Sequence, residues 1–261
     1  MSLRALRQPT LAAILGVGAL LLVAGCAPAS TAQPAPAPES PTAPAPTVEP
    51  TAEPEPEPSF DASARSIDDP DSIWVVSNKL RPLDPADFAP DDLVIPENVE
   101  NEWGQPLRRP AARAVEKLVA AAERAGHGLW IISAYRDYGT QQSLYDGYVA
   151  RDGRDAADTY SARPGHSEHQ TGLAVDLDDH GDCYLAACFG ETPAGAWIAE
   201  HAQEHGFVIR YPEGSEEITG FTYEPWHLRY VGEDLAREMH ETGTETLEEF
   251  FDLPPAPGYA E

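Results

Sequence analysis

The chain has 261 residues, of which 44 are acidic and 17 basic, so its formal net charge at pH 7 is −27. A surface this negative repels nucleic acid, which binds clustered positive charge, and nucleic acid is therefore excluded as a partner. Two segments of biased composition, at 1–25 and 26–66, leave roughly 180 residues for a fold, enough for one domain with a core.

The first 25 residues are typical of a secretory signal peptide. Arg4 and Arg7 form a basic start, an apolar run covers 11–24, and small residues lead to Cys26. The apolar run is short for a membrane span, although an uncleaved N-terminal anchor is the alternative interpretation. The segment VAGC at 23–26 resembles a bacterial lipobox. This resemblance implies a lipid on Cys26 and an exported protein anchored at the outer face of the cytoplasmic membrane, next to the cell wall.

The composition changes again after Cys26. Residues 26–66 consist largely of Ala, Pro, Thr and Glu, which cannot bury a core and which favour extended conformations. We expect this linker to be a disordered stalk that lets the folded part reach away from the membrane. The folded domain is expected at 67–250. The chain ends in LPPAPGYAE, and we expect a loose tail over 251–261.

Within 67–250, apolar residues recur with both helical and strand spacing. Proline opens and glycine closes the clearest helices. In chain order, the predicted elements are a helix at 110–126, a strand at 129–132, a helix at 140–149, a strand at 173–177, a helix at 192–206, a strand at 207–211, a strand within 222–230 and a helix after 232. No regular strand–helix–strand repeat is visible. The pattern therefore predicts a single α+β domain with a small, mostly antiparallel sheet and flanking helices.

The chain has three cysteines. If Cys26 carries a lipid, Cys183 and Cys188 remain, and an exported protein meets an oxidising compartment. The pair therefore predicts a short disulfide loop that fixes local shape more than global stability. A zinc site that uses both thiolates is the alternative, but no second cysteine pair is present to complete it.

One histidine pattern matches a zinc-protease signature. His201 and His205, with Glu204 between them, form the inverted H-x-x-E-H motif, and two histidines four residues apart on a helix can share a metal. Gly206 follows at once, however, so His205 lies in the last turn, where the helix dipole alone favours a histidine. A terminal helical histidine is the simpler interpretation.

A second candidate metal site lies in GHSEHQTGLAVDLDD at 165–179. His169 ends a predicted loop, Gly172 permits a tight turn, and Asp176 then points from the following strand. Further along, Pro225 breaks regular pairing, so that Glu224 and His227 can approach one point. Spacing alone leaves a non-metal alternative open for each segment. The first could be an acidic, solvated loop, and the second could be a buried Trp–His pair in a core strand.

Longer motifs decide between these interpretations. SEHQTGLAVD at 167–176, followed by YEPWHLRYVG at 223–232, resembles the VanY-like D-alanyl-D-alanine carboxypeptidases, which are zinc enzymes of bacterial cell-wall metabolism. The likeness includes SAYR at 133–136 and TPAGAWIAEHAQEHGFVIRYP at 192–212, and it covers roughly 73–230. Each short motif is weak alone, but the combination is specific.

The resemblance implies one zinc ion and a hydrolytic mechanism. It makes His169, Asp176 and His227 the zinc ligands. Glu224 becomes the general base that takes a proton from the attacking water. Arg136 becomes the residue that steadies the substrate carbonyl as it turns into an oxyanion.

The resemblance also implies a substrate. Gln141 and Ser167 are expected to bind the free C-terminal carboxylate of a peptide. No role is implied for His166, Asp178, Asp179, His201 and His205. The expected function is a zinc carboxypeptidase that removes the C-terminal D-alanine from peptidoglycan stem peptides. The alternatives are an endopeptidase of the same family and a non-catalytic zinc-containing cell-wall binding module; the presence of Glu224 and all three ligands disfavours the module.

Overall fold

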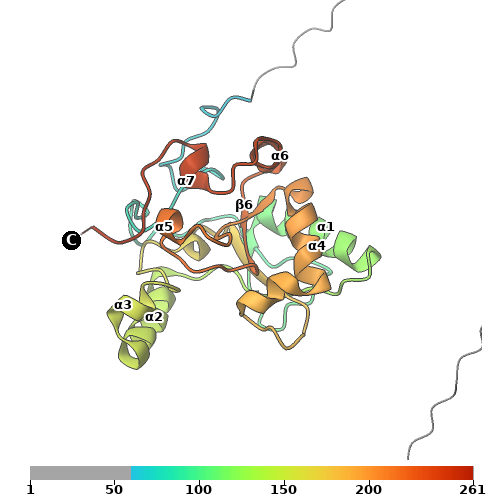
Figure 1. Ribbon diagram of the computed structural model, residues 1–261, viewed down its shortest axis with the longest axis horizontal. Helices are drawn as coiled ribbons and strands as arrows, with labels where there is room; N and C mark the ends of the chain where they lie inside the picture. The colour runs from blue at the N-terminus through green and yellow to red at the C-terminus, as the bar shows by residue number, and fades with distance from the viewer. Residues whose placement is uncertain (1–59, 261) are drawn as a thin grey trace, which may run out of the picture. The chain divides into compact units, whose positions relative to one another are not determined.

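The computed structural model describes residues 60–260 (Figure 1). Short strands alternate with helices and 3-10 turns along this part of the chain. In chain order the elements are β1 (Leu93–Val94), β2 (Leu107–Arg108), α1 (Arg109–Arg124), β3 (Trp130–Ser133), α2 (Tyr138–Asp152), α3 (Arg154–Ala157), η1 (Glu168–Thr171), β4 (Ala174–Asp178), η2 (Ala187–Glu191), α4 (Pro193–His201), η3 (Ala202–His205), β5 (Phe207–Ile209), α5 (Glu216–Thr219), β6 (His227–Tyr230), α6 (Glu233–Thr242) and α7 (Leu247–Phe250). The predicted α+β class is confirmed.

The central sheet is antiparallel and has the strand order β3-β4-β6-β5. Its two middle strands, β4 and β6, pair so that Asp176 lies directly opposite His227. A register shift in β3 between Ile131 and Ser133 bends the strand where it meets Asp176. The small separate ladder of β1 and β2 lies outside this sheet. The two middle strands therefore bring two distant motifs side by side.

The two faces of the central sheet differ in chemistry. Val175, Leu177 and Leu228 point to one face and join a buried apolar cluster with residues of α1 and α4. Those two helices lie on the same side of the sheet in Figure 1. Because side chains alternate along a strand, Asp176 and His227 point to the opposite face. The covered face supplies the core, and the other face is free to carry polar groups.

A second apolar cluster joins the N-terminal arm to α6 and α7. It contains Trp74, Leu235 and Leu247, and the ring of Phe60 packs against Trp74 with a centroid distance of 5.6 Å. The sequence predicts a linker that runs to residue 66, whereas Phe60 already packs as part of the domain. The amino-acid composition indicates a linker here, but it does not reveal that the ring of Phe60 packs against the domain.

The C-terminal residues also differ from the expected loose tail. Ala256 is fully buried, and its N–H donates to the carbonyl of Ile218 at 2.7 Å. The Tyr259 hydroxyl accepts a hydrogen bond from the backbone N–H of Arg163 at 2.7 Å, and the Arg163 guanidinium lies 4.0 Å from the centre of the Tyr259 ring. The proline-rich C-terminal segment therefore packs against the domain without forming a helix or a strand.

The longer predicted elements are present with small shifts in their ends. The helix expected at 192–206 changes to a 3-10 turn at Ala202, and the strand expected at 207–211 ends at Ile209. The predicted signal peptide, the lipobox cysteine and most of the linker lie outside the described residues. No helix within 60–260 has both the length and the apolar character needed to cross a membrane.

Candidate metal centre

A 3-10 turn followed by a glycine positions the first two candidate ligands. His169 lies in η1, and Gly172 follows with a left-handed φ of 68°. A side chain at Gly172 would come within 2.9 Å of Arg108, so both the turn and the packing require glycine. The chain then enters β4, where Asp176 points back toward His169. The predicted tight turn between these two residues is present.

A second turn positions the other two candidate residues. Pro225 and Trp226 form a turn that is closed by a hydrogen bond of 3.1 Å from the His227 N–H to the Glu224 carbonyl. This turn places Glu224 and His227 on the same side, although three residues separate them. His227 then begins β6 opposite Asp176. The kink that Pro225 predicts is therefore the feature that brings Glu224 to the site.

His169, Asp176 and His227 converge. One potential ligand atom from each lies within 4.8 Å of the others, and all three side chains are buried. Nε2 of His169 is 3.3 Å from one Asp176 oxygen, and Nδ1 of His227 is 3.2 Å from the other. No other group of three His, Cys, Asp or Glu side chains converges in this way within residues 60–260.

The triad fits a zinc ion. Two imidazoles and one carboxylate are a donor set that zinc takes in hydrolytic sites, where a fourth position stays open for water. Asp176 Oδ1 is buried and accepts no hydrogen bond from the described residues, as expected for an oxygen reserved for a cation. Burial would raise the pKa of Asp176, but His169 and His227 outweigh it and hold this pKa well below its usual range. The carboxylate is therefore ionised and available as a ligand.

Glu224 lies beside the triad. Its carboxylate oxygen is 3.5 Å from His227 Nδ1, and the side chain is nearly buried. Burial raises the pKa of Glu224 to about 8, against the opposing charges of His227 and Arg136. A carboxyl group whose pKa lies close to neutral can both accept and return a proton, which is the property required of a general base.

Arg136 supplies a positive charge at the same place. It lies between β3 and α2, and its backbone N–H donates to the His169 carbonyl at 3.2 Å. Burial lowers the pKa of Arg136, while the nearby carboxylates of Asp176 and Glu224 oppose this shift. Its Nε is buried and has no hydrogen-bond partner among the described residues. Arg136 also lines the pocket beside the triad, where its guanidinium can meet a substrate oxygen.

These residues border one pocket of about 410 Å³. Arg136, Ser167, Glu224 and the three triad residues line it, as expected. No sequence motif singles out the remaining lining residues, which come from segments far apart in the chain. These are Leu144, Tyr148, Arg151, Tyr160, Ser161, Ala162, Glu168, Leu185, Tyr211, Phe221, Thr222 and Trp226.

The two predicted carboxylate-binding residues differ in position. Ser167 lines the pocket, next to the triad. Gln141 is buried beneath the wall, where its amide donates to the Ala162 carbonyl at 2.6 Å and to the Ser161 hydroxyl at 3.4 Å. Ser161 and Ala162 are lining residues, so Gln141 holds the wall from behind. Direct contact of Gln141 with a substrate carboxylate stays a prediction that this arrangement does not favour.

The H-x-x-E-H motif has a local explanation. His201 ends α4, and its Nδ1 lies 3.0 Å from a carboxylate oxygen of Glu204. His205 ends η3, where Gly206 takes a left-handed φ of 79°. Neither histidine belongs to the converging triad. This motif is therefore part of a helix end.

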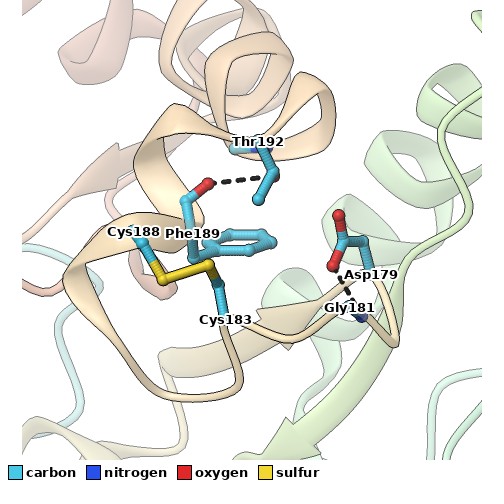
Figure 2. Close-up of a disulfide and its surroundings, with 7 residues drawn as sticks. Asp179, Gly181, Cys183, Cys188, Phe189 and Thr192 are labelled. Carbon is cyan, nitrogen blue, oxygen red and sulfur yellow. Dashed lines mark hydrogen bonds between the residues drawn. A yellow bond between two sulfur atoms is a disulfide. The ribbon is translucent and has the colours of Figure 1, made fainter.

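A disulfide closes the loop between β4 and α4 (Figure 2). Cys183 and Cys188 are joined, as the sequence predicts, and Phe189 next to them is fully buried. The Thr192 hydroxyl donates to the Phe189 carbonyl at 2.9 Å, which ties the loop to the start of α4. Within the loop, Leu185 reaches the pocket rim. The bridge therefore fixes a segment that forms part of the pocket wall.

The sequence of this chain is similar to those of known carboxypeptidases. A family model described as VanY, D-alanyl-D-alanine carboxypeptidase, matches residues 104–233. The putative carboxypeptidase YodJ of Bacillus subtilis (strain 168) is 39% identical over 195 residues, which are 72% of this chain and 70% of that protein.

Two solved structures are also similar. The LdcB LD-carboxypeptidase is 40% identical with a TM-score of 0.65, and the match covers 70% of this chain and 87% of that one. A mutant of the D,D-pentapeptidase VanY from a VanB-type resistance cassette, solved with Zn(II), is 31% identical with a TM-score of 0.58, and the match covers 69% of this chain and 98% of that one.

Proposed function

Because this chain belongs to the VanY family of D-alanyl-D-alanine carboxypeptidases and is a zinc metallopeptidase of that type, we propose that it removes the C-terminal D-alanine from peptidoglycan stem peptides. The observation that carries this proposal is the convergence of His169, Asp176 and His227 beside Glu224 and Arg136 in one pocket. His169, Asp176 and His227 would hold one zinc ion per chain.

Each residue around the metal position has a separate role in the proposed reaction. When bound, zinc activates a water molecule and polarises the peptide carbonyl. Glu224 takes the proton of the attacking water and returns it to the leaving amine. Arg136 donates to the carbonyl oxygen as negative charge develops there. Ser167, at the pocket wall, offers a hydroxyl to the C-terminal carboxylate.

A substrate carboxylate needs positive charge inside the pocket. The whole chain carries a net charge of −27, yet a substrate that ends in a carboxylate must approach the site. Arg136 and Arg151 line the pocket, but so do the carboxylates of Glu168, Asp176 and Glu224. The pocket would therefore become net positive only with the zinc ion bound. Such a field would favour a substrate with a free C-terminal carboxylate, which is the feature that separates a carboxypeptidase from an endopeptidase.

The test uses the chain from Ala27 onward with synthetic stem peptides and mass spectrometry. The panel includes a tetrapeptide and a pentapeptide, because the similar LdcB and VanY proteins are named for LD and D,D bonds respectively. A cross-linked peptide without a free D-alanine end tests for endopeptidase activity. We expect loss of one alanine, abolished by a zinc chelator, and one zinc per chain by metal analysis. Absence of cleavage by zinc-loaded protein would favour the binding-module alternative, and cleavage of only the cross-linked peptide would favour the endopeptidase.

We also propose that the protein is exported and held at the outer face of the cytoplasmic membrane by a lipid on Cys26. The basic start, the apolar run and the VAGC segment support this location. Replacement of Cys26 by Ala should move the protein from the membrane fraction of a bacterial host to the soluble or secreted fraction. Equal membrane retention of Cys26→Ala would argue instead for an uncleaved anchor.

A further inference from the structure

Glu168 stands directly before the candidate ligand His169, but its side chain belongs to a different group of residues. It is fully buried, and one of its oxygens, Oε1, accepts hydrogen bonds from Arg210 Nε at 2.9 Å and from Arg229 Nη1 at 2.8 Å. The sequence suggested only an acidic loop residue here. The structure instead places this carboxylate between two buried guanidinium groups.

The buried charges around Glu168 balance one another. Arg210 also forms a two-pronged pair with Glu248 of α7, with contacts of 2.9 and 2.7 Å. The remaining Arg229 donors go to backbone carbonyls, including that of Val75 at 2.7 Å. Two carboxylates therefore offset two guanidiniums inside the protein. Such buried networks contribute little net stability compared with apolar packing, so the network calls for a functional reason.

One atom of this network lacks a partner. Glu168 Oε2 is buried and accepts no hydrogen bond from the described residues. It lies 3.9 Å from Nε2 of His227, which is also buried and without a partner among the described residues. A hydrogen bond needs a separation of about 3 Å, so a shift of about 1 Å would join the two atoms. Two orphaned polar atoms thus face each other behind the triad.

The orientation of the His227 ring relates this contact to metal binding. Its other nitrogen, Nδ1, faces the triad, at 3.2 Å from Asp176 Oδ1. A neutral imidazole that ligates a metal through Nδ1 carries its proton on Nε2, which is the atom that faces Glu168.

His169 shows the complementary arrangement. Its Nδ1 lies 2.6 Å from the Ala134 carbonyl, to which it donates when its Nε2 faces the triad. Each candidate histidine ligand thus has one nitrogen directed at the metal position. The other nitrogen of His169 is already fixed by a carbonyl, whereas that of His227 faces only the Glu168 carboxylate.

We propose that Glu168 is a positioning residue, which accepts a hydrogen bond from the Nε2–H of His227 and thereby holds this ligand with Nδ1 toward the zinc ion. This inference rests on the proposed zinc site. A carboxylate behind a histidine ligand fixes the ring and raises its basicity, and loss of such a partner weakens metal binding. Arg210 and Arg229 hold the carboxylate in place through its other oxygen.

The test compares Glu168→Gln with the matched variant Glu248→Gln. Both remove one negative charge from the same buried network, but only Glu168 faces His227. In Glu168→Gln the single carbonyl oxygen is engaged by two arginines, so the amide NH₂ faces the Nε2–H of His227, donor against donor. Zinc affinity is measured on both full-length variants by competition with a chelator, after circular dichroism shows that each metal-free variant is folded.

We expect Glu168→Gln to weaken zinc binding about 10- to 100-fold, while Glu248→Gln stays near the wild-type affinity. Equal affinities for the two variants would overturn the positioning role without touching the proposed function. Failure of the wild-type protein to bind zinc would instead overturn the proposed function.

A second measurement needs no variant and applies even where Glu168→Gln does not fold. In nitrogen-15 spectra of the zinc-loaded wild-type protein, one histidine ring should bind zinc through Nδ1 and carry a slowly exchanging proton on Nε2. If both zinc-bound rings carry their proton on Nδ1, the proposed contact between His227 and Glu168 does not exist.

Discussion

Turnover should depend strongly on Glu224. It lies 3.5 Å from His227 Nδ1 but is not one of the triad, so its replacement should spare the metal. We expect Glu224→Gln to keep zinc and to lower kcat by about 100-fold or more, because the amide cannot accept the proton of water. Metal analysis and kcat on a stem peptide check this.

The exposed residue Glu213 provides the control for this change. It precedes α5 on the surface, and Glu213→Gln removes the same charge from the molecule without altering the pocket. It should therefore leave kcat unchanged. A Glu224→Gln variant that turns over substrate as fast as Glu213→Gln would remove Glu224 from the mechanism.

Arg136 should affect the transition state more than substrate binding. Its place in the pocket lining, beside Asp176 and Glu224, suits it to a developing oxyanion. We expect Arg136→Ala to lower kcat by about 100- to 1,000-fold while zinc stays bound. Steady-state kinetics with metal analysis test this, and the exposed Arg154→Ala serves as the charge-matched control. A rise in KM alone would assign Arg136 to carboxylate binding, and loss of zinc would make it structural.

The disulfide loop between β4 and α4 is the element with the clearest separate role. Its tip exposes Tyr184 and Leu185, and Leu185 lines the pocket in a left-handed conformation with a φ of 48°. We expect the double variant Cys183→Ser/Cys188→Ser to lose about 2 kcal/mol of stability, since the closed loop is short. It should also raise KM more than it changes kcat, because the wall formed by Leu185 is no longer held.

Leu185→Ala, with the disulfide intact, separates the wall from the bridge. It should raise KM with little change in the unfolding midpoint, whereas the double variant should change both. If neither variant alters KM, the loop serves stability alone. Thermal unfolding and steady-state kinetics on the same samples give both quantities.

The elements that sequence predicts well are those with strong local signals. Pro110 lies in the first turn of α1, and the apolar spacing continues through this helix. Pro225 lies in the turn that brings Glu224 and His227 together. Short elements such as α3, α5 and α7 span only four residues each and carry no periodicity to detect. Their positions depend on tertiary contacts.

The difference between local and long-range signals also explains which residues of the candidate site can be predicted from the sequence. The triad and Glu224 lie in two motifs that a sequence resemblance can identify. Glu168 pairs with Arg210 and Arg229, which are 42 and 61 residues away, and nothing local in the sequence distinguishes this acid from the many exposed acids of the chain. The tail that packs through Tyr259 was likewise invisible to composition. Hydrogen bonds and ion pairs between residues far apart in the chain are therefore the part of the structure that cannot be predicted from local patterns in one sequence.

The stability of the whole metal-free molecule should depend on pH through the same site. Burial raises the pKa of Glu224 from 4.5 to about 8 in the folded state. Between these values the folded protein binds a proton that the unfolded chain has lost, so stability falls as pH rises, by at most about 1.4 kcal/mol per pH unit. Burial alone would lower the pKa of His227, but Asp176, Glu168 and Glu224 raise it to about 9, which adds a loss of the same sign above pH 6.5.

Glu224→Gln removes the first of these two contributions. In the presence of a chelator, the variant should have nearly the wild-type free energy of unfolding at pH 5 and a higher one at pH 8. Denaturant titrations at one-unit pH intervals measure the difference, and Glu213→Gln again provides the control. A difference that stays constant from pH 5 to pH 8 would mean that the pKa of Glu224 is not raised in the folded, metal-free protein.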